Sequence, residues 1–208
     1  MNLIYDIKKL IPLIGDKIKK KLNSFSKSSN LKENEIFLEL CFCILVANNS
    51  IKNAQKVWNK INIGFLTLSE SELSKKIKEN HGRFYNKRAK YIVEARKRKS
   101  EIYKIIKQEK NEMKLREWLV KNINGIGMKE ASHFLRNLGF RNFAILDRHV
   151  LKILKKYKII NDIPKSLSMK KYVEIENKLK EIANKIKISQ AELDIYLFYL
   201  DSGKICEK

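Results

Sequence analysis

Apolar residues recur every three or four positions along almost the whole chain, which is the spacing of one face of an α-helix. Residues that interrupt helices are rare, since the 208 residues include only two prolines and seven glycines. The pattern therefore predicts an all-α fold. The expected helices cover residues 4–22, 35–47, 52–60, 69–77, 86–107, 112–120, 130–138, 148–156, 172–186 and 190–202.

Local signals support several of these boundaries. Ser189 followed by Glu192 predicts a capping box at the start of the last helix. Gly139 is placed to terminate the helix over residues 130–138. The serine- and asparagine-rich residues 23–30 are expected to form a connector. The helix over residues 35–47 is almost entirely apolar, so we expect it to stand at the centre of a helical bundle.

The charge of the chain changes this picture from a plain helical bundle to one that attracts anions. Forty-five lysines and arginines against 23 acidic residues leave a net charge of +22, which is enough to draw in a polyanion by diffusion. A lysine-rich composition of thermophile type is the alternative, but it raises glutamate as well as lysine. Because this chain has far fewer acidic than basic residues, we favour a basic surface that binds a polyanion.

Nothing in the sequence indicates a membrane protein or an exported one. The longest apolar run, residues 36–47, has 12 residues and contains Glu39, which suits a buried helix and is too short to cross a bilayer. The first six residues lack the basic start and apolar stretch of a secretory signal. We therefore expect an intracellular, cytoplasmic protein that does not bind a membrane.

The cysteines do not indicate a metal centre. Cys41 and Cys43 are two residues apart on a predicted helix and so lie on different faces, which is unsuited to joint metal binding. With Cys206 they number only three, too few for a four-cysteine cluster. We expect Cys41 and Cys43 to be small core residues, and we expect neither a metal nor an organic cofactor.

The segment Asn122–Lys129 joins two predicted helices through two glycines, Gly125 and Gly127. Glycines one residue apart allow a tight hairpin whose backbone N–H groups, with Asn124 beside them, can hold a phosphate. A Gly-x-Gly turn by itself is weak evidence, because it also serves simply to reverse the chain. Between two amphipathic helices of so basic a chain, we favour binding of a DNA backbone.

Lys129 and Asp147 are the candidates for chemistry. Lys129 falls in the first turn of the helix after the hairpin, where the positive end of the helix dipole favours a neutral, nucleophilic amine. The alternative is a solvated surface lysine among many. Asp147 directly precedes another predicted helix, so its alternative role is that of an N-cap. The two roles of Asp147 are compatible, because a capping carboxylate stays ionised and can stabilise a cation nearby.

The order of a helix, the glycine hairpin, Lys129, a second helix and then Leu146–Val150 resembles the helix-hairpin-helix DNA glycosylases. Among these the chain looks most like the archaeal type of 8-oxoguanine DNA glycosylase/AP lyase, and the resemblance spans residue 31 to the C-terminus. Family members of the endonuclease III type usually carry an iron–sulfur cluster after the aspartate. The cysteines for that cluster are lacking here, as they are in the oxoguanine enzymes.

The resemblance implies a bifunctional enzyme whose partner is double-stranded DNA containing 8-oxoguanine. It assigns to Lys129 the attack on C1′ of the flipped nucleotide and the formation of a Schiff base. It assigns to Asp147 the stabilisation of the positive charge that develops on the sugar. β-Elimination then nicks the strand, without a cofactor.

The resemblance also implies a pocket for the extruded base, lined by Asp194, Phe198 and the terminal Lys208, and the helical spacing adds His133 to this pocket. Asp194 is expected to accept the N7–H that 8-oxoguanine has and guanine lacks, and Phe198 to stack on the base. His133 is four residues after Lys129 and therefore on the same helix face. A surface histidine without a role and an ordinary core phenylalanine are the respective alternatives.

Asn48, Phe84 and Arg88 are the remaining predicted DNA contacts. Asn48 follows the apolar helix in a loop that resembles the one filling the gap left by the flipped base, and an exposed Asn-Asn turn is its alternative. Phe84 and Arg88 belong to a basic and aromatic cluster, residues 82–88, that suits a DNA groove or wedge. The alternative for Phe84 is a core aromatic at a helix start.

We expect two helical lobes with the helix-hairpin-helix motif at the cleft between them. Residues 31–141 would form a helical barrel lobe, and residues 1–30 with 142–208 a second lobe that carries Asp147 and the base pocket. A monomer associated with the nucleoid is expected. Two alternatives stay open: an endonuclease III-like glycosylase for oxidised pyrimidines, and a non-catalytic helix-hairpin-helix DNA-binding module.

Overall fold

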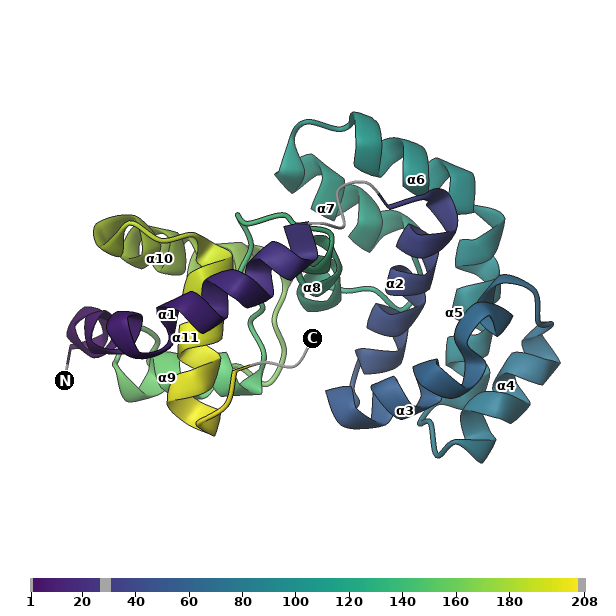
Figure 1. Cartoon of the computed structure of the whole chain (residues 1–208), viewed down its shortest axis with the longest axis horizontal. Helices are drawn as coiled ribbons and strands as arrows, with labels where there is room; N and C mark the ends of the chain where they lie inside the picture. The colour runs from purple at the N-terminus through teal and green to yellow at the C-terminus, as the bar shows by residue number, and fades with distance from the viewer. Residues whose placement is uncertain (1, 27–30, 206–208) are drawn as a thin grey trace. The chain divides into compact units, whose positions relative to one another are not determined.

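The computed structural model describes residues 2–26 and 31–205. These residues form eleven α-helices and one short 3-10 helix and no strand, so the predicted all-α fold is confirmed. The chain divides into two compact units, one of Met1–Ser29 with Leu135–Lys208 and one of Asn30–Phe134 (Figure 1). The division falls inside a helix, seven residues before the predicted boundary at residue 141.

The unit of Asn30–Phe134 is organised around the apolar helix α2 (Glu33–Val46). Nine of the 14 residues of α2 are buried, and α2 contacts α3, η2, α5 and α6, so its predicted central place is confirmed. Cys41 and Cys43 are free cysteines in this core, as predicted, while Cys206 lies outside the described residues. The other elements are α3 (Ile51–Ile61), η2 (Asn62–Leu66), α4 (Glu70–Glu79), α5 (Tyr85–Lys97), α6 (Lys99–Gln108), α7 (Glu112–Asn122) and the start of α8 (Met128–Asn137).

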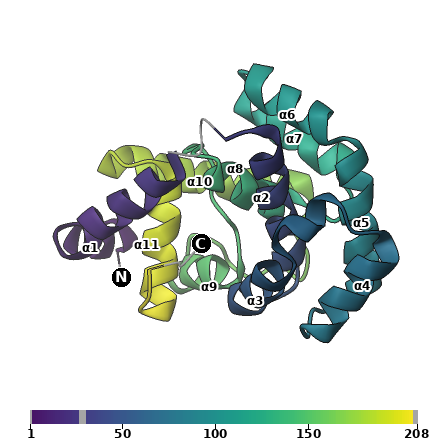
Figure 2. The same cartoon turned by 45° about the vertical axis from the view of Figure 1, so that its right-hand side comes forward.

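The other unit is organised around the last helix, α11 (Gln190–Ser202). α11, yellow in Figures 1 and 2, contacts α1 (Leu3–Ser26), α9 (Arg148–Lys156) and α10 (Met169–Ile186). Its predicted ends are confirmed: Ser189 and Glu192 form a capping box, and Gly203 adopts the left-handed conformation (φ 68°) at the C-terminal end. Gly139 likewise has a positive φ of 98° after α8.

The single helix predicted over residues 86–107 is wrong, because the structure breaks it at Arg98 into α5 and α6. The Arg98 backbone leaves the helical region, and its side chain is held by neighbouring groups. Its Nη1 donates to the carbonyl of Asn122 at 2.7 Å, and its guanidinium lies over Trp118 and pairs with Glu101. Apolar spacing continues across Arg98, so the pattern alone does not reveal the break.

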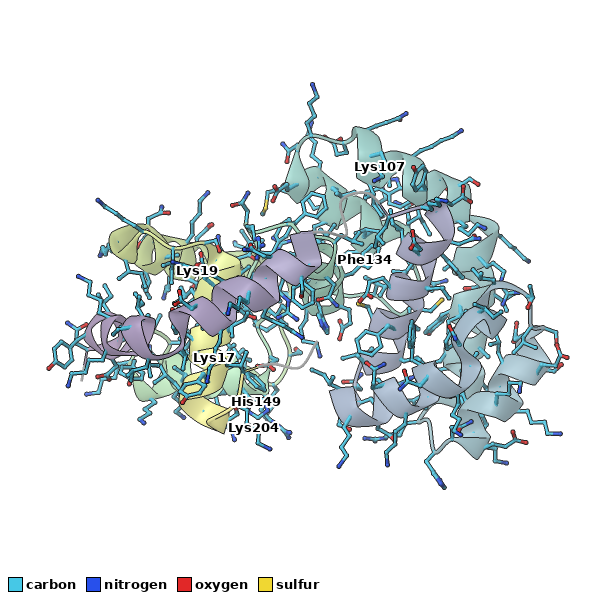
Figure 3. All side chains as sticks on the ribbon, in the orientation of Figure 1. Lys17, Lys19, Lys107, Phe134, His149 and Lys204 are labelled. Carbon is cyan, nitrogen blue, oxygen red and sulfur yellow. The ribbon has the colours of Figure 1, made fainter. Side chains whose placement is uncertain are left out.

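Basic side chains extend from the surfaces of both units. Lys17 and Lys19 are exposed on α1, Lys107 on α6 and Lys204 after α11 (Figure 3). Among the helices of the described residues, none has the length and apolar character needed to cross a membrane.

Candidate active site

The predicted hairpin lies between α7 and α8, and glycine is required at its tip. Gly125 has a φ of 84°, a conformation that costs a residue with a side chain about 1 kcal/mol or more. A Cβ placed there would come within 2.6 Å of Cδ2 of Tyr91. Ile123 and Ile126 are buried on either side of the tip. The hairpin is therefore anchored by two apolar side chains and closed against the Tyr91 ring.

Polar contacts from α5 and the α5–α6 break hold the entry to the hairpin. Nδ2 of Asn124 donates to Oε2 of Glu94 at 2.9 Å. Two residues earlier in the chain, the carbonyl of Asn122 accepts a hydrogen bond from Arg98. The Asn124 side chain is exposed, so its predicted DNA contact stays a prediction. In the structure its amide is oriented by Glu94.

Lys129 is the second residue of α8 and has a neighbouring carboxylate that the sequence reasoning missed. Its Nζ lies 3.0 Å from Oε1 of Glu130, and the exposed fractions of the two side chains are 32% and 14%. The expectation of a neutral amine did not take this ion pair into account. Oε2 of Glu130 lies 3.2 Å from where a Cβ on Gly127 would be, so a side chain at position 127 would be in tight contact with Glu130.

His133 is buried within the unit of Asn30–Phe134, with 4% of its surface exposed. Its ring packs edge-on against Phe42 of α2, with 6.3 Å between ring centroids. The alternative of a surface histidine is therefore wrong. A role for His133 against an extruded base stays a prediction.

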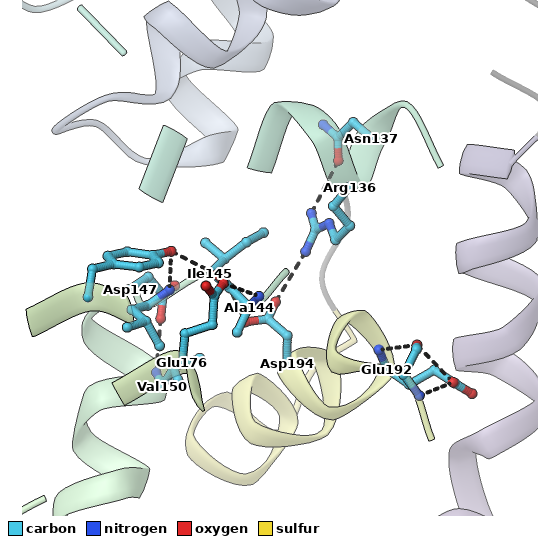
Figure 4. Close-up of polar contacts among 12 residues, drawn as sticks. Arg136, Asn137, Ala144, Ile145, Asp147, Val150, Glu176, Glu192 and Asp194 are labelled. Atoms are coloured by element: carbon cyan, nitrogen blue, oxygen red, sulfur yellow. Dashed lines mark hydrogen bonds and ion pairs between the residues drawn. The ribbon is translucent and has the colours of Figure 1, made fainter. Parts of the chain in front are cut away.

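Asp147 caps α9. Its Oδ1 accepts the backbone N–H of Val150 at 2.9 Å, which confirms the N-cap predicted from its position (Figure 4). A carboxylate fixed in this way points along a defined direction and carries its charge at a helix N-terminus, where negative charge is favoured. This geometry is compatible with the predicted chemical role and does not test it.

Asp194 is buried on α11, and both of its carboxylate oxygens have protein partners. Oδ1 accepts the N–H of Ile145 at 2.8 Å, and Oδ2 lies 3.4 Å from Nη1 of Arg136, itself 3% exposed (Figure 4). Burial raises the pKa of Asp194 to about 7; Arg136 opposes this rise and the charge of Asp147 adds to it. Recognition of a base by Asp194 stays a prediction, and it has to coexist with these contacts.

Phe198 lies one turn beyond Asp194 and is only partly buried, so it is not an ordinary core residue. The ring of His149 packs edge-on against it at 4.9 Å, and Nδ1 of His149 is 2.5 Å from Oδ2 of Asp201. His149 and Asp201 were not predicted as site residues. The signal available in the sequence was the position of His149, two residues after Asp147.

The predicted direct DNA contact of Arg88 is not supported by its position. Arg88 is 3% exposed, and its two terminal nitrogens donate to the carbonyls of Leu45 and Ala47 at the end of α2. Burial, and secondarily the neighbouring Arg83, lowers the pKa of Arg88 to about 10. Its guanidinium is thus used to hold the loop that follows α2.

Asn48 and Phe84, in contrast, are presented at the surface. Both are exposed and both have a positive φ, 52° and 53°, which is rare for residues with side chains and common at functional loops. Their proposed contacts with DNA stay predictions. Lys208 lies outside the described residues. Within residues 2–26 and 31–205, no group of three His, Cys, Asp or Glu side chains is arranged to hold a metal ion.

The two all-α units and the hairpin between α7 and α8 define the class of protein, the helix-hairpin-helix proteins. A family model described as 8-oxoguanine DNA glycosylase matches residues 18–188, and the chain belongs to this family. The family expected from the Gly125–Lys129 hairpin and Asp147 is thereby confirmed.

Similar proteins with this description come from several organisms. The 8-oxoguanine DNA glycosylase/AP lyase of Methanocaldococcus jannaschii is 47% identical over 192 residues, which cover 92% of each chain, and that of Korarchaeum cryptofilum is 45% identical over 188 residues. The crystal structure of the Methanocaldococcus jannaschii 8-oxoguanine glycosylase/lyase in complex with a 15mer DNA containing 8-oxoguanine matches with a TM-score of 0.95 over the whole of both chains. The 8-oxoguanine DNA glycosylase of Thermotoga maritima matches with a TM-score of 0.90 at 36% identity, covering 99% of this chain and 98% of the other.

Proposed function

We propose that this chain excises 8-oxoguanine from double-stranded DNA and cleaves the strand at the abasic site that results. The glycosylase and AP lyase activities follow from the family and from relatives of that name that are 42–47% identical over most of the chain. One observation carries the assignment of the reaction centre: a partly exposed lysine, Lys129, directly follows the glycine hairpin in the first turn of α8.

Lys129 acts as the nucleophile. After the damaged nucleotide leaves the base stack, the lone pair of Nζ forms a bond to C1′, and the glycosidic bond breaks with its electron pair going to the base. Loss of a proton from the nitrogen and opening of the sugar ring give a Schiff base, from which β-elimination breaks the strand. Nζ must first give up a proton and part from Glu130. Asp147 stabilises the positive charge that develops on the sugar.

The extruded base is read by a pocket to which Asp194, Phe198, His133 and Lys208 contribute. The partly exposed ring of Phe198, held on one edge by His149, supports a stacking role. Asn48 and Phe84, exposed on loops with positive φ, serve as the residues that enter the space left by the base. Asn124, Gly125 and Gly127 contact the phosphate backbone.

Borohydride trapping tests this function. With an 8-oxoguanine duplex the wild-type chain should give a covalent adduct, which disappears in Lys129→Gln while binding to the duplex remains. Lys121→Gln is the matched control, because it removes the charge of an exposed lysine at the end of α7 and should leave the adduct at its wild-type level.

The outcomes separate the alternatives. Binding without any adduct from the wild-type chain would indicate a non-catalytic helix-hairpin-helix module. An adduct that persists in Lys129→Gln would refute the choice of nucleophile. Faster excision of thymine glycol than of 8-oxoguanine under single-turnover conditions would favour the endonuclease III-like alternative.

We expect one chain to be sufficient for this reaction. Because the substrate is double-stranded DNA, the enzyme would act at the chromosome. The net charge of +22 supports a monomer, because two copies repel each other in the absence of DNA. Sedimentation equilibrium at low salt should give the mass of a single chain, and a dimer mass would contradict this.

A further inference from the structure

The segment that leads into Asp147 is buried without belonging to any helix or sheet. Phe143, Ala144, Ile145 and Leu146, here called the linking segment, lie in the stretch between α8 and α9, and all four are buried. Buried backbone N–H and C=O groups need hydrogen-bond partners. Side chains of α10 and α11 supply those partners.

Three successive N–H groups of the linking segment donate to three different side chains. Ala144 donates to Oε1 of Glu176 at 3.1 Å and Ile145 to Oδ1 of Asp194 at 2.8 Å (Figure 4). Leu146 donates to the hydroxyl of Tyr172 at 3.2 Å.

The same Tyr172 hydroxyl donates to the carbonyl of Ala144 at 2.7 Å, so it bridges two residues of the linking segment. Tyr172, Glu176 and Asp194 are 1%, 2% and 4% exposed.

The linking segment then turns tightly into the cap of α9. The N–H of Asp147 donates to the carbonyl of Ile145 at 2.7 Å, and the Asp147 carboxylate accepts the N–H of Val150. The direction of the Asp147 carboxylate is therefore set by backbone on both sides. On one side that backbone is α9, and on the other it is the linking segment with its three side-chain partners.

We propose that Tyr172, Glu176 and Asp194 are positioning residues that hold the Asp147 carboxylate in the geometry needed for base excision. Burying two carboxylates costs free energy that a buried apolar pair does not, so their presence here favours a functional requirement over packing alone. The proposal rests on the proposed function, because it needs Asp147 to take part in the reaction.

Asp194 also interacts electrostatically with Asp147. The charges of Asp194 and Asp147 repel, and Nη1 of Arg136 lies 3.4 Å from Oδ2 of Asp194. Arg136 in turn packs over the Phe25 ring and contacts Oδ1 of Asn137. Arg136 therefore offsets the repulsion that Asp194 would otherwise exert on the reacting carboxylate.

Tyr172→Phe tests the proposal with the smallest change. It removes the hydroxyl that bridges Ala144 and Leu146 and keeps the ring. We expect single-turnover excision of 8-oxoguanine to slow by about 10- to 100-fold, since small displacements of a reacting group have effects of this size. Affinity for a duplex that contains an uncleavable abasic-site analogue should be unchanged.

A double-mutant cycle distinguishes positioning from general loss of structure. In an Asp147→Asn background, Tyr172→Phe should cause no further slowing, because the group it positions has already lost its charge. Glu176→Gln, which keeps an acceptor for the Ala144 N–H, should retain most of the rate that Glu176→Leu loses. Tyr157→Phe is the matched control: its hydroxyl binds Asp6 in the same unit, away from the linking segment, and the rate should stay at the wild-type level.

Two results would overturn the proposal. One is a wild-type excision rate in folded Tyr172→Phe, and the other is an equal slowing by Tyr172→Phe with and without Asp147. If thermal melting shows that Tyr172→Phe is unfolded at the assay temperature, Glu176→Leu replaces it in the same cycle with the same expected results. The wild-type adduct on the same duplex reports on the proposed function separately: without it the function is wrong and the positioning role falls with it.

Discussion

Asp147 has a structural role as the cap of α9 and a proposed role in the reaction. Substitution of Asp147 by asparagine distinguishes these two roles. Asp147→Asn keeps an oxygen that can accept the Val150 N–H and loses the charge. We expect single-turnover excision to slow by about 10²- to 10³-fold, the usual effect of removing a group that stabilises transition-state charge, with unchanged melting temperature and DNA affinity.

Asp147→Ala is the comparison that removes the cap as well. It should lose about 1 kcal/mol of stability in addition to the activity. Near-wild-type excision by Asp147→Asn would mean that Asp147 serves α9 as a cap and nothing more.

Asp194 should make the stability of the protein depend on pH in an unusual direction. Its pKa is about 7 in the folded chain and near 4 in an unfolded one, so the folded state holds the proton to higher pH. The free energy of unfolding contributed by this group is therefore fully present below about pH 4 and falls as pH rises towards 7, by at most about 1.4 kcal/mol per pH unit.

Urea unfolding at pH 5 and pH 8 measures this effect. Wild type should lose more stability between the two pH values than Asp194→Asn, whose side chain does not titrate. The other ionisable groups are common to both chains, so the difference isolates Asp194. An identical pH dependence would show that the carboxyl of Asp194 is ionised throughout this range.

The role of a single residue is predictable from the sequence where its local position sets that role, and is not predictable where the role depends on long-range contacts. The cap at Asp147 and the glycine at position 125 follow from their immediate neighbours in the chain. The burial of Arg88 depends on the carbonyls of Leu45 and Ala47, about 40 residues away, and no spacing rule carries that information.

The hairpin is the element whose geometry most directly depends on one residue. Gly125→Ala imposes both an unfavourable φ and a Cβ 2.6 Å from the Tyr91 ring. We expect a loss of about 1–2 kcal/mol or more in stability and a clear loss of affinity for undamaged duplex, measured by thermal melting and by DNA titration.

Gly203→Ala is a matched control within the same chain. Gly203 has a φ of 68°, but a Cβ there meets nothing within 4 Å. It should show the conformational cost alone and keep its DNA affinity. Equal effects of the two substitutions on DNA affinity would contradict the assignment of the hairpin as a phosphate contact.

Helices were predictable from their apolar faces and caps, whereas the break at Arg98 was not. The helix breaks at Arg98 because its side chain donates a hydrogen bond to the carbonyl of Asn122. This hydrogen bond brings the α5–α6 junction to the entry of the hairpin. The linking segment is the other element that pattern did not reveal. Its backbone partners are side chains of α10 and α11, so neither helical nor strand spacing marks it.

For the molecule as a whole, the all-α class follows from spacing and the attraction to DNA from charge, since both are sums over many residues. The division of the chain into two units is harder to predict from the sequence. It falls between Phe134 and Leu135 inside α8, where the chain continues as one helix and the sequence has no glycine, proline or linker composition. Which helices pack together is decided by contacts such as those of α11 with α1, which join residues at opposite ends of the chain.

The excess of 22 positive charges predicts a steep dependence of DNA affinity on salt. Each phosphate neutralised by a lysine or arginine releases a condensed counterion, so the logarithm of the association constant falls linearly with the logarithm of salt concentration. For about 6–10 phosphate contacts, affinity for an undamaged duplex should drop by about 10³-fold or more between about 50 and 200 mM salt. The ratio of affinities for 8-oxoguanine and undamaged duplexes should change far less, because recognition of the base relies on short-range contacts that salt screens weakly. Parallel titrations of both duplexes across that range of salt concentration measure the two effects. A shallow salt dependence for undamaged DNA would mean that most of the lysines do not contact DNA. The lysine-rich composition would then be of the thermophile type, against which the low number of acidic residues argues.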